Sequence, residues 1–279
     1  HRTNSLFLPS ARLAGTIHAT GDIADLGALP VLLAVVPAQF LGPVLGQLPA
    51  GNRDLVLCAK GIEAGTGRLM SDVAATVAAP ASIAVLSGPT FAHEVAAGLP
   101  TAVTLACGGG EVQWQRLAPL LARPALRPYY SDDVIGAEVG GAVKNVLAIA
   151  CGVVDGLGLG QNARAALIAR GYAEMLPLAL RLGAQPETLA GLSGFGDLVL
   201  TCTSPQSRNL RFGMALGSGA AFDPGVTVEG VATSRAVARM AAGLQVDMPV
   251  TQMVADLIDQ KMPLDQAVIS LMSRPLKQE

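Results

Sequence analysis

The stretch "SIAVLSGPTFAHEVAAGLPTAVTLAC", residues 82–107, decides how the first half of the chain is interpreted. It opens with a short apolar run, turns sharply at Gly88 and Pro89, continues with a helix-like segment and closes with a second apolar run. The two apolar runs contain few polar residues, as strands covered on both faces do. The stretch therefore predicts a strand, a helix and a strand in succession.

The same alternation extends to either side of this stretch. Apolar runs that predict strands are found at 31–37, 54–61, 82–89 and 101–107. Strands alternating with helices favour a mostly parallel sheet. After Ser131 the strand signals stop, and helices are predicted at 134–154, 162–182, 206–216, 231–242 and 251–257. We expect an α/β protein with a partial doubly wound, Rossmann-like sheet domain in residues 1–133 and an all-helical domain in residues 134–279.

The composition bounds the kind of protein. The 279 residues are 51% hydrophobic and only 14% charged, so the chain can bury a large core. A formal net charge of -2 indicates neither nucleic acid nor an anionic membrane surface as a partner. The most apolar run is broken by Pro30, Pro37 and Pro43, so we expect no membrane span. The four cysteines show no C-x-x-C spacing, so we predict no metal site and no disulfide framework, and expect a reducing cytoplasm.

A single lysine stands inside the otherwise small and apolar stretch "GGAVKNVLAIACGVVDGLG", residues 140–158. On a helix, the residues that share a face with Lys144 are mostly small: Gly140, Gly141, Leu147, Ala148 and Cys151. One interpretation is a lysine that extends to water from the edge of a closely packed helix. The other is a general acid and base, because a partly desolvated lysine near other cations has a lowered pKa. Spacing alone leaves both interpretations open.

Other polar residues stand where ligands commonly bind. Lys60 directly follows a predicted strand, and ligands collect at the carboxyl ends of parallel strands. Thr90 stands where a helix is expected to open, so it can cap that helix or help to hold an anion, and the two roles are compatible. Each position is equally compatible with an ordinary loop or capping residue.

The densest polar cluster is in "GFGDLVLTCTSPQSRNLRFG", residues 194–213. Ser204 and Pro205 predict a helix start, which places Ser207, Arg208 and Asn209 in its first turns. A hydroxyl, a guanidinium and an amide at a helix N-terminus suit a phosphate or a carboxylate. Asp197, upstream between glycines and an apolar run, by itself suggests only a helix cap.

The segment Gly158–Ala163 formally matches the dinucleotide-binding pattern G-x-G-x-x-G/A. It follows a predicted helix instead of a strand, so the turn that cradles a pyrophosphate is not expected there. We do not assign a cofactor site to it.

Several segments, in this order, resemble bacterial NAD(P)-dependent sn-glycerol-3-phosphate dehydrogenases. They are "CAKGIEAGTGRL", "SGPTFAHEVAAGLPTAVTLA", "GGAVKNVLAIACGVVDGLGLGQNARAALIARG", "GFGDLVLTCTSPQSRNLRFGMALG" and "VEGVATS". Together they span most of residues 55–234. Several motifs in a fixed order are far more specific than one glycine pattern.

The resemblance implies a role for particular residues. Lys144 is similar to the family's catalytic lysine, which exchanges the proton of the secondary hydroxyl as hydride passes between glycerol 3-phosphate and the nicotinamide. The substrate-binding residues implied are Lys60, Gly88, Thr90, Asp197, Ser207, Arg208 and Asn209. The NAD- or NADP-binding residues implied are Lys60, Ala92, Arg208, Thr227 and Glu229. The resemblance further implies a cytoplasmic homodimer that supplies glycerol phosphate for phospholipid synthesis.

The sequence departs from the family at its start. The segment "NSLFLP", residues 4–9, resembles a part of the family that follows the usual strand, G-x-G-x-x-G turn and helix. We therefore expect that the pyrophosphate cradle is not part of this sequence, and the predicted cofactor is NAD or NADP. Two alternatives stay open: a 3-hydroxyacid dehydrogenase of related architecture and a non-catalytic, truncated relic.

Overall fold

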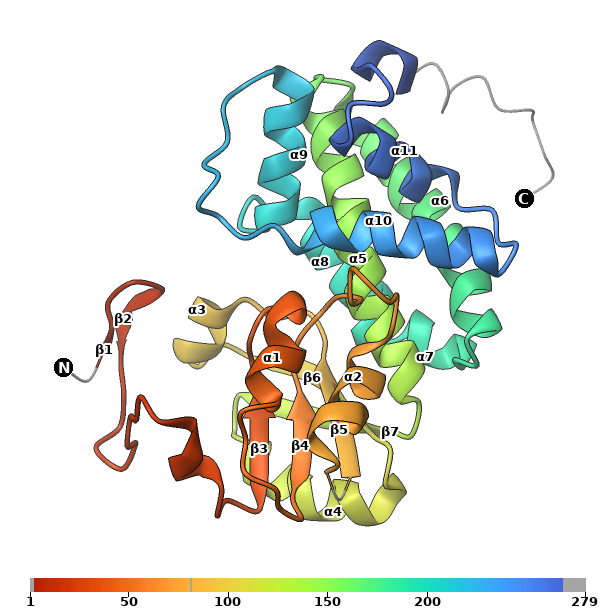
Figure 1. The fold of residues 1–279 in the computed structure, drawn as a ribbon. Helices are drawn as coiled ribbons and strands as arrows, with labels where there is room; N and C mark the ends of the chain where they lie inside the picture. Colours follow the sequence, from red (N-terminus) through yellow and green to blue (C-terminus); the bar gives the residue numbers. More distant parts are fainter. Residues whose placement is uncertain (1–2, 81, 268–279) are drawn as a thin grey trace.

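The computed structural model describes residues 3–80 and 82–267. It has a sheet domain, from which a small N-terminal hairpin stands apart, and a helical domain, with the long helix α5 passing from one domain to the other (Figure 1). The hairpin is formed by β1 (Thr3–Asn4) and β2 (Leu8–Arg12). The strands of the main sheet are β3 (Val31–Ala34), β4 (Asp54–Leu57), β5 (Ser82–Ser87), β6 (Thr101–Cys107) and β7 (Leu126–Ser131). They lie in the order β3-β4-β5-β6-β7.

The expected Rossmann-like sheet is present, but one of its pairings is antiparallel. Strands β3, β4 and β5 are parallel, β5 pairs with β6 antiparallel, and β6 pairs with β7 parallel. The helix between β5 and β6 is α3, Ala92–Ala96, which has only five residues. At about 1.5 Å a residue it rises about 7 Å, too little to return along a strand of about 20 Å. The chain therefore re-enters the sheet from the end at which β5 left it.

Helices cover both faces of this sheet. On one face lie α1 (Leu41–Leu45) and α2 (Met70–Ala78), packed against Leu55 and Leu57 of β4. On the other lies α4 (Gly110–Leu121), packed against Val56. Successive residues of a strand point to opposite faces, so one apolar run supplies both cores. Two short helical turns, Ile23–Leu26 and Ala38–Phe40, lie in the connections on either side of β3.

The edge strand β7 was not predicted. Its sequence "LRPYYS" contains a proline and mixes polar with apolar residues, and its burial is partial. An edge strand has one unpaired side, so it needs neither the continuous apolar pattern nor every backbone N–H. The signal that reveals buried strands is therefore weak here.

The helical domain is built around α5, Val134–Gly156. The elements around it are α6 (Gly160–Arg181), α7 (Pro186–Ala190), a π-helical turn (Leu192–Gly196), α8 (Asp197–Thr203), α9 (Arg208–Ser218), α10 (Glu229–Gly243) and α11 (Pro249–Ile258). Every residue from 136 to 154 is buried. Although α5 is long and apolar enough to cross a membrane, 89% of its apolar window is buried within the protein. Because the sheet ends at Ser131 and α5 begins at Val134, we propose a domain division into residues 1–133 and 134–279.

The helix starts differ from the sequence expectations at two places. Helix α9 begins at Arg208 and is capped by Ser207, whose Oγ accepts from the Leu210 amide at 3.2 Å, so Ser204 and Pro205 do not begin the helix. Helix α3 begins at Ala92 without a side-chain cap, so Thr90 does not cap it. The segment Gly158–Ala163 follows α5 and includes the first residues of α6, without a strand before it, as expected.

Glycines let α5 and α9 cross in close contact. A Cβ at Gly152 of α5 would lie 2.1 Å from the Leu210 carbonyl oxygen and 2.8 Å from the Cα of Gly213 in α9. A Cβ at Gly213 would lie 2.1 Å from the Ile149 carbonyl oxygen. These neighbours are backbone atoms, which cannot move aside separately. The seam therefore fixes the position of α9 against the C-terminal half of α5.

Gly152→Ala is expected to destabilise the protein by about 3 kcal/mol, because the added methyl forces the two helices apart. The control is Gly243→Ala at the end of α10, where a Cβ would meet nothing within 4 Å. That variant should be neutral or slightly more stable. Thermal unfolding checks both, and equal Tm values for parent and Gly152→Ala would contradict the close packing.

Candidate active site

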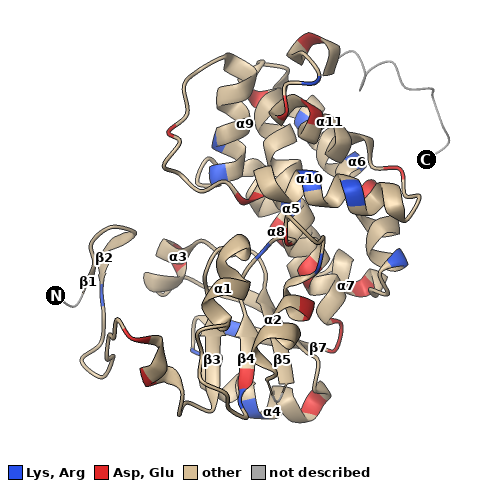
Figure 2. Cartoon of the chain, in the orientation of Figure 1, with Lys and Arg blue, Asp and Glu red and all other residues tan. Residues whose placement is uncertain are grey.

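The site residues of the two domains meet where the carboxyl ends of β4 and β5 face the middle of α5. Lys60 follows β4, Gly88 follows β5, and Lys144 lies near the centre of α5. Asp197 is the first residue of α8 and follows the π-helical turn. Basic and acidic residues both lie in the region where α5 leaves the sheet domain (Figure 2).

One buried carboxylate joins the two lysines. Lys144 Nζ donates to Asp197 Oδ1 at 2.5 Å, and Lys60 Nζ donates to Asp197 Oδ2 at 2.6 Å. Lys144 is 6% exposed and Asp197 is 0% exposed. The structure thus rules out the interpretation of Lys144 as a lysine that extends to water. Lys60, with a side chain 20% exposed, also donates to the Gly88 carbonyl oxygen at 3.1 Å.

This arrangement shifts the pKa values of the group. Burial, followed by the like charge of Lys60, lowers the pKa of Lys144 to about 7, although Asp197 opposes the shift. Burial acts to raise the pKa of Asp197, but Lys60 and Lys144 hold it below its ordinary value. Asp197 therefore remains ionised while Lys144 can gain or lose a proton near neutral pH.

Two residues that the sequence did not mark as site residues belong to this group. Thr201, one turn after Asp197 on α8, accepts a hydrogen bond from Lys144 Nζ at 2.9 Å and donates to Asp197 Oδ1 at 3.2 Å. Asn145 Nδ2 donates to the Lys60 carbonyl oxygen at 3.2 Å, and Asn145 Oδ1 accepts from Asn209 Nδ2 at 2.9 Å. In the sequence, only two features pointed to these residues: Asn145 is next to Lys144, and Thr201 is one turn after Asp197.

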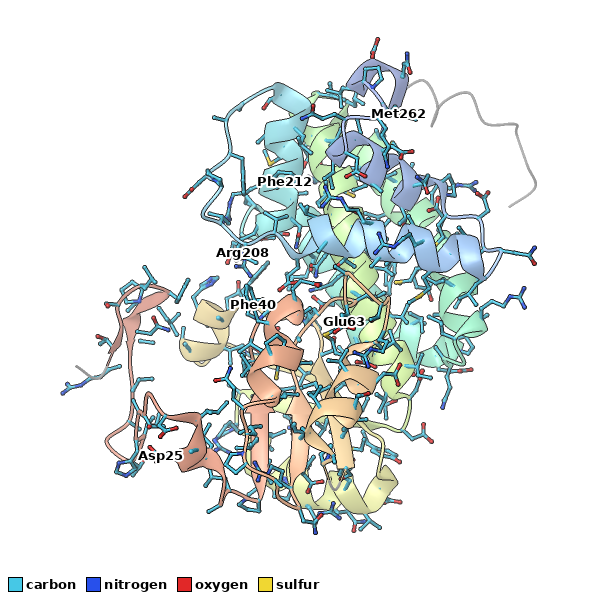
Figure 3. The ribbon with its side chains drawn as sticks, viewed as in Figure 1. Asp25, Phe40, Glu63, Arg208, Phe212 and Met262 are labelled. Atoms are coloured by element: carbon cyan, nitrogen blue, oxygen red, sulfur yellow. The ribbon has the colours of Figure 1, made fainter. Side chains whose placement is uncertain are left out.

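The predicted anion-binding cluster divides into buried and exposed members. Ser207 is buried and caps α9, and Asn209 is buried, with its Oδ1 accepting from the Gly230 amide at 2.9 Å. Arg208 is exposed, and among the described residues it forms no hydrogen bond or salt bridge with a side chain. Figure 3 labels it on the side of the helical domain that faces the sheet domain, opposite Phe40. Its guanidinium is therefore available to an anion that enters between the domains.

The turn after β5 approaches the site through its backbone. Gly88 has φ +156°, and a Cβ there would lie 2.9 Å from the Cα of Val103. A side chain at this position is thus excluded. The Gly88 carbonyl oxygen accepts hydrogen bonds from Lys60 and, at 3.3 Å, from Thr90 Oγ1. Ala92, at the start of α3, is exposed.

The two remaining predicted residues lie at the start of α10. Glu229 Oε1 accepts from the Ala38 amide at 3.3 Å, so it links α10 to the loop after β3. Burial raises the pKa of Glu229, while the charge of Arg208 opposes the shift. Thr227 is exposed in the loop before α10. Neither residue contacts Lys144 or Asp197 through a hydrogen bond in the described part of the chain.

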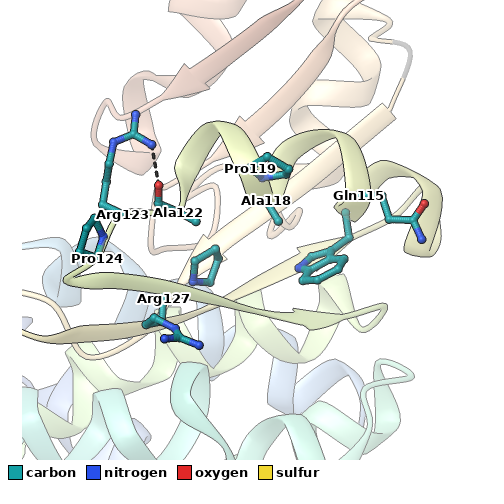
Figure 4. Close-up of a pocket in the computed structure, with 9 residues that line it drawn as sticks. Gln115, Ala118, Pro119, Ala122, Arg123, Pro124 and Arg127 are labelled. Atoms are coloured by element: carbon teal, nitrogen blue, oxygen red, sulfur yellow. Dashed lines mark hydrogen bonds between the residues drawn. The ribbon is translucent and has the colours of Figure 1, made fainter.

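A separate cavity of about 620 Å³ lies between α4 and β7 (Figure 4). It is lined by Trp114, Gln115, Ala118, Pro119, Ala122, Arg123, Pro124, Arg127 and Pro128. None of the predicted site residues is among them. The two guanidinium groups point away from each other, so they do not converge on one ligand.

The chain is similar to one group of enzymes along its whole length. The family described as NAD-dependent glycerol-3-phosphate dehydrogenase matches with its N-terminal part over residues 1–112 and with its C-terminal part over residues 133–269. The chain is 61% identical to a glycerol-3-phosphate dehydrogenase [NAD(P)+] of Novosphingobium aromaticivorans, covering 100% of this chain and 86% of that protein. It is 62% identical to one of Erythrobacter litoralis, with 99% and 84% covered. A crystal structure of glycerol-3-phosphate dehydrogenase from Coxiella burnetii superposes with a TM-score of 0.91 at 40% identity, over 98% of this chain and 86% of that one.

Proposed function

Because the chain belongs to the family of NAD-dependent glycerol-3-phosphate dehydrogenases, we propose that the two lysines and the carboxylate they share are the machinery of its reaction. The protein is an oxidoreductase that interconverts sn-glycerol 3-phosphate and dihydroxyacetone phosphate with NAD(P). The observation that carries the proposal is the contact of both Lys144 and Lys60 with Asp197.

Lys144 acts as the general acid and base. In the oxidising direction its neutral amine takes the proton from the secondary hydroxyl, and in the reducing direction its ammonium returns that proton to the developing alkoxide. A pKa of about 7 lets the same group perform both steps near neutral pH. Asp197 and Thr201 hold the amine in place, and the charge of Lys60 stabilises negative charge on the substrate oxygen.

The phosphate of the substrate binds at the start of α9. Arg208 supplies two parallel donors to the phosphate oxygens, and the N-terminus of an 11-residue helix favours an anion. Ser207 and Asn209 support this site and, together with Gly88 and Thr90, border the substrate. The polar residues of this group fit a phosphorylated substrate better than a 3-hydroxyacid.

The resemblance to the family assigns five residues to the cofactor. They are Lys60, Ala92, Arg208, Thr227 and Glu229. Arg208 and Glu229 fit this assignment, since Arg208 is exposed towards the sheet domain and Glu229 contacts the loop after β3. When bound, NAD(P) would supply hydride transfer, from the carbinol carbon of glycerol 3-phosphate or to the carbonyl carbon of dihydroxyacetone phosphate.

We further propose that the protein acts in the cytoplasm as a homodimer and that its product enters glycerophospholipid synthesis. The compartment is supported by the four free cysteines, and the other two statements follow from the resemblance to the family.

The function is tested by oxidation of NADH and NADPH with dihydroxyacetone phosphate, compared with a panel of 3-oxoacids. Among these substrates, we expect turnover of dihydroxyacetone phosphate and of none of the 3-oxoacids. Turnover of a 3-oxoacid in its place would favour the hydroxyacid dehydrogenase alternative. A folded chain without measurable affinity for either nicotinamide cofactor would favour the non-catalytic alternative.

Arg208→Ala is expected to raise the KM for dihydroxyacetone phosphate by about 10- to 100-fold, since a charge-assisted bond to phosphate contributes about 1.5–3 kcal/mol. The Tm should hardly change, because Arg208 is exposed and bonds to no described side chain. The control is Arg211→Ala on the same helix, where the guanidinium donates to the Pro205 and Gln206 carbonyl oxygens. An unchanged KM in Arg208→Ala would contradict the phosphate site.

A further inference from the structure

Glu138 is a buried carboxylate on α5 that the proposed chemistry does not use. It is 4% exposed and forms no salt bridge with any described residue. Its Oε1 accepts from the Ser71 backbone amide at 2.7 Å, and its Oε2 accepts from Ser71 Oγ at 2.6 Å. A carboxylate removed from water without a cation is costly, so its retention here needs a reason.

The hydrogen bonds of Glu138 cap a helix of the sheet domain. Ser71 is the second residue of α2, and the residue that precedes α2, Leu69, provides no side-chain cap. The first N–H groups of a helix lack partners within it and attract negative charge. The cap of α2 is therefore supplied from α5, the helix that also carries Lys144.

Helix α2 directly follows the chain segment that carries Lys60. This segment, residues 58–69, runs from the end of β4 to the start of α2. It is fastened to α5 at two points: Asn145 donates to the Lys60 carbonyl oxygen near its beginning, and Glu138 binds Ser71 just beyond its end. The first of these points is Lys60 itself, whose side chain reaches Asp197.

We propose that Glu138 is a positioning residue that fastens the segment 58–69 to α5 and thereby sets the place of Lys60 relative to Lys144 and Asp197. The inference rests on the roles proposed above for the two lysines. It assigns to Glu138 an effect on the reaction that acts through Lys60 and without any contact with substrate.

The consequence is electrostatic. The groups that face Lys144 are Lys60, Asp197 and Thr201, with the Cys202 thiol nearby. Glu138 is hydrogen-bonded by Ser71 and by the Met70 backbone, and the charged group acting on it is Asp72. If the segment loosens, Lys60 recedes, its like charge acts less on Lys144, and the pKa of Lys144 rises. Loss of the negative charge of Glu138 would by itself lower that pKa, so the direction of the shift separates the two effects.

The chain contains a matched control. Glu174 of α6 is also buried, and both of its carboxylate oxygens accept from the Val250 amide at 3.0 Å, at the start of α11. It thus caps a helix from a neighbouring helix, as Glu138 does, but within the helical domain. Its loss should reduce stability without moving Lys60.

The experiment follows the titration of Lys144 by NMR in protein labelled with ¹³C at the lysine ε-carbons. The chain has only four lysines, and the spectrum of Lys144→Arg assigns the signal. We expect Glu138→Ala to raise the titration midpoint of Lys144 by about 0.5–1 unit and to reduce kcat/KM about 10-fold. Glu138→Gln should restore most of kcat/KM and should not raise the midpoint, because its amide oxygen can still accept from the Ser71 N–H. Glu174→Ala should lower Tm and leave the midpoint unchanged.

The inference is overturned if Glu138→Ala lowers Tm as Glu174→Ala does but leaves the Lys144 titration where it was, or moves it downward. If Glu138→Ala does not fold, Ser71→Ala, which removes one of the two hydrogen bonds, must shift the midpoint upward by a smaller amount; no shift overturns the inference. The titration needs neither cofactor nor substrate. A parent protein without dehydrogenase activity would therefore contradict the proposed function, whereas an unchanged titration would contradict only the role of Glu138.

Discussion

Lys144→Met is expected to reduce kcat by about 10³-fold in both directions while the protein stays folded. The side chain is nearly isosteric, and Asp197 keeps Lys60 as its partner, so no buried carboxylate is left unpaired. Steady-state turnover with saturating substrate and cofactor measures the effect, and Tm measures folding. The control is Lys261→Met, an exposed lysine paired with Asp259, which should retain full activity.

The pH dependence of the parent provides an independent check on the same residue. Reduction needs the ammonium form, so kcat/KM for dihydroxyacetone phosphate should fall as pH rises through about 7. Oxidation needs the amine and should rise over the same range. Because the folded-state pKa lies below the ordinary value of 10.5, the folded state binds fewer protons than the unfolded chain between these two values. The contribution of Lys144 therefore makes stability increase as pH rises from about 7 to 10.5. Substantial turnover by Lys144→Met, or rates independent of pH near 7, would refute the assigned role.

Asp197→Asn is expected to lower both stability and activity. The carboxylate is 0% exposed and receives hydrogen bonds from two ammonium groups. Removing one member of a buried charged group typically costs about 3–5 kcal/mol, because the remaining charges stay buried without compensation. The pKa of Lys144 should fall further, since Asp197 is the group that favours its charged form. We therefore expect a lower Tm, a reduction rate at pH 7 lowered about 100-fold, and a midpoint displaced to lower pH.

The matched control for this variant is Asp155→Asn at the other end of α5. Asp155 Oδ2 accepts from Arg164 at 2.7 Å, with side chains 14% and 17% exposed. Its loss should cost less stability and leave the pH profile unchanged, because the pair is less buried and remote from Lys144. A normal profile in Asp197→Asn would show that the carboxylate does not govern the proton of Lys144.

Local structure drew attention to several residues of the candidate site, but the resemblance to the family, and not their spacing, assigned their roles. Lys60 stands after a strand, Lys144 inside a small-residue helix, and Arg208 at a helix start. Thr201 and Asn145 were missed, since a threonine one turn after an aspartate and an asparagine beside a lysine are common in any helix. Only the distances from Lys144 and Lys60 distinguish them from ordinary helical residues.

The order of elements, the apolar runs and the buried helix α5 were determined by the sequence itself, because hydrophobic periodicity and helix punctuation are local properties of the chain. The antiparallel entry of β6 depends on how far the short helix α3 reaches. The capping of α9 by Ser207 depends on which side chain lies close enough to accept from a free N–H group of the helix. The tertiary structure alone decided that Lys144 and Lys60, 84 residues apart, share one carboxylate. Charge and burial act through space, so a pKa near 7 is a property of the folded arrangement and not of any segment.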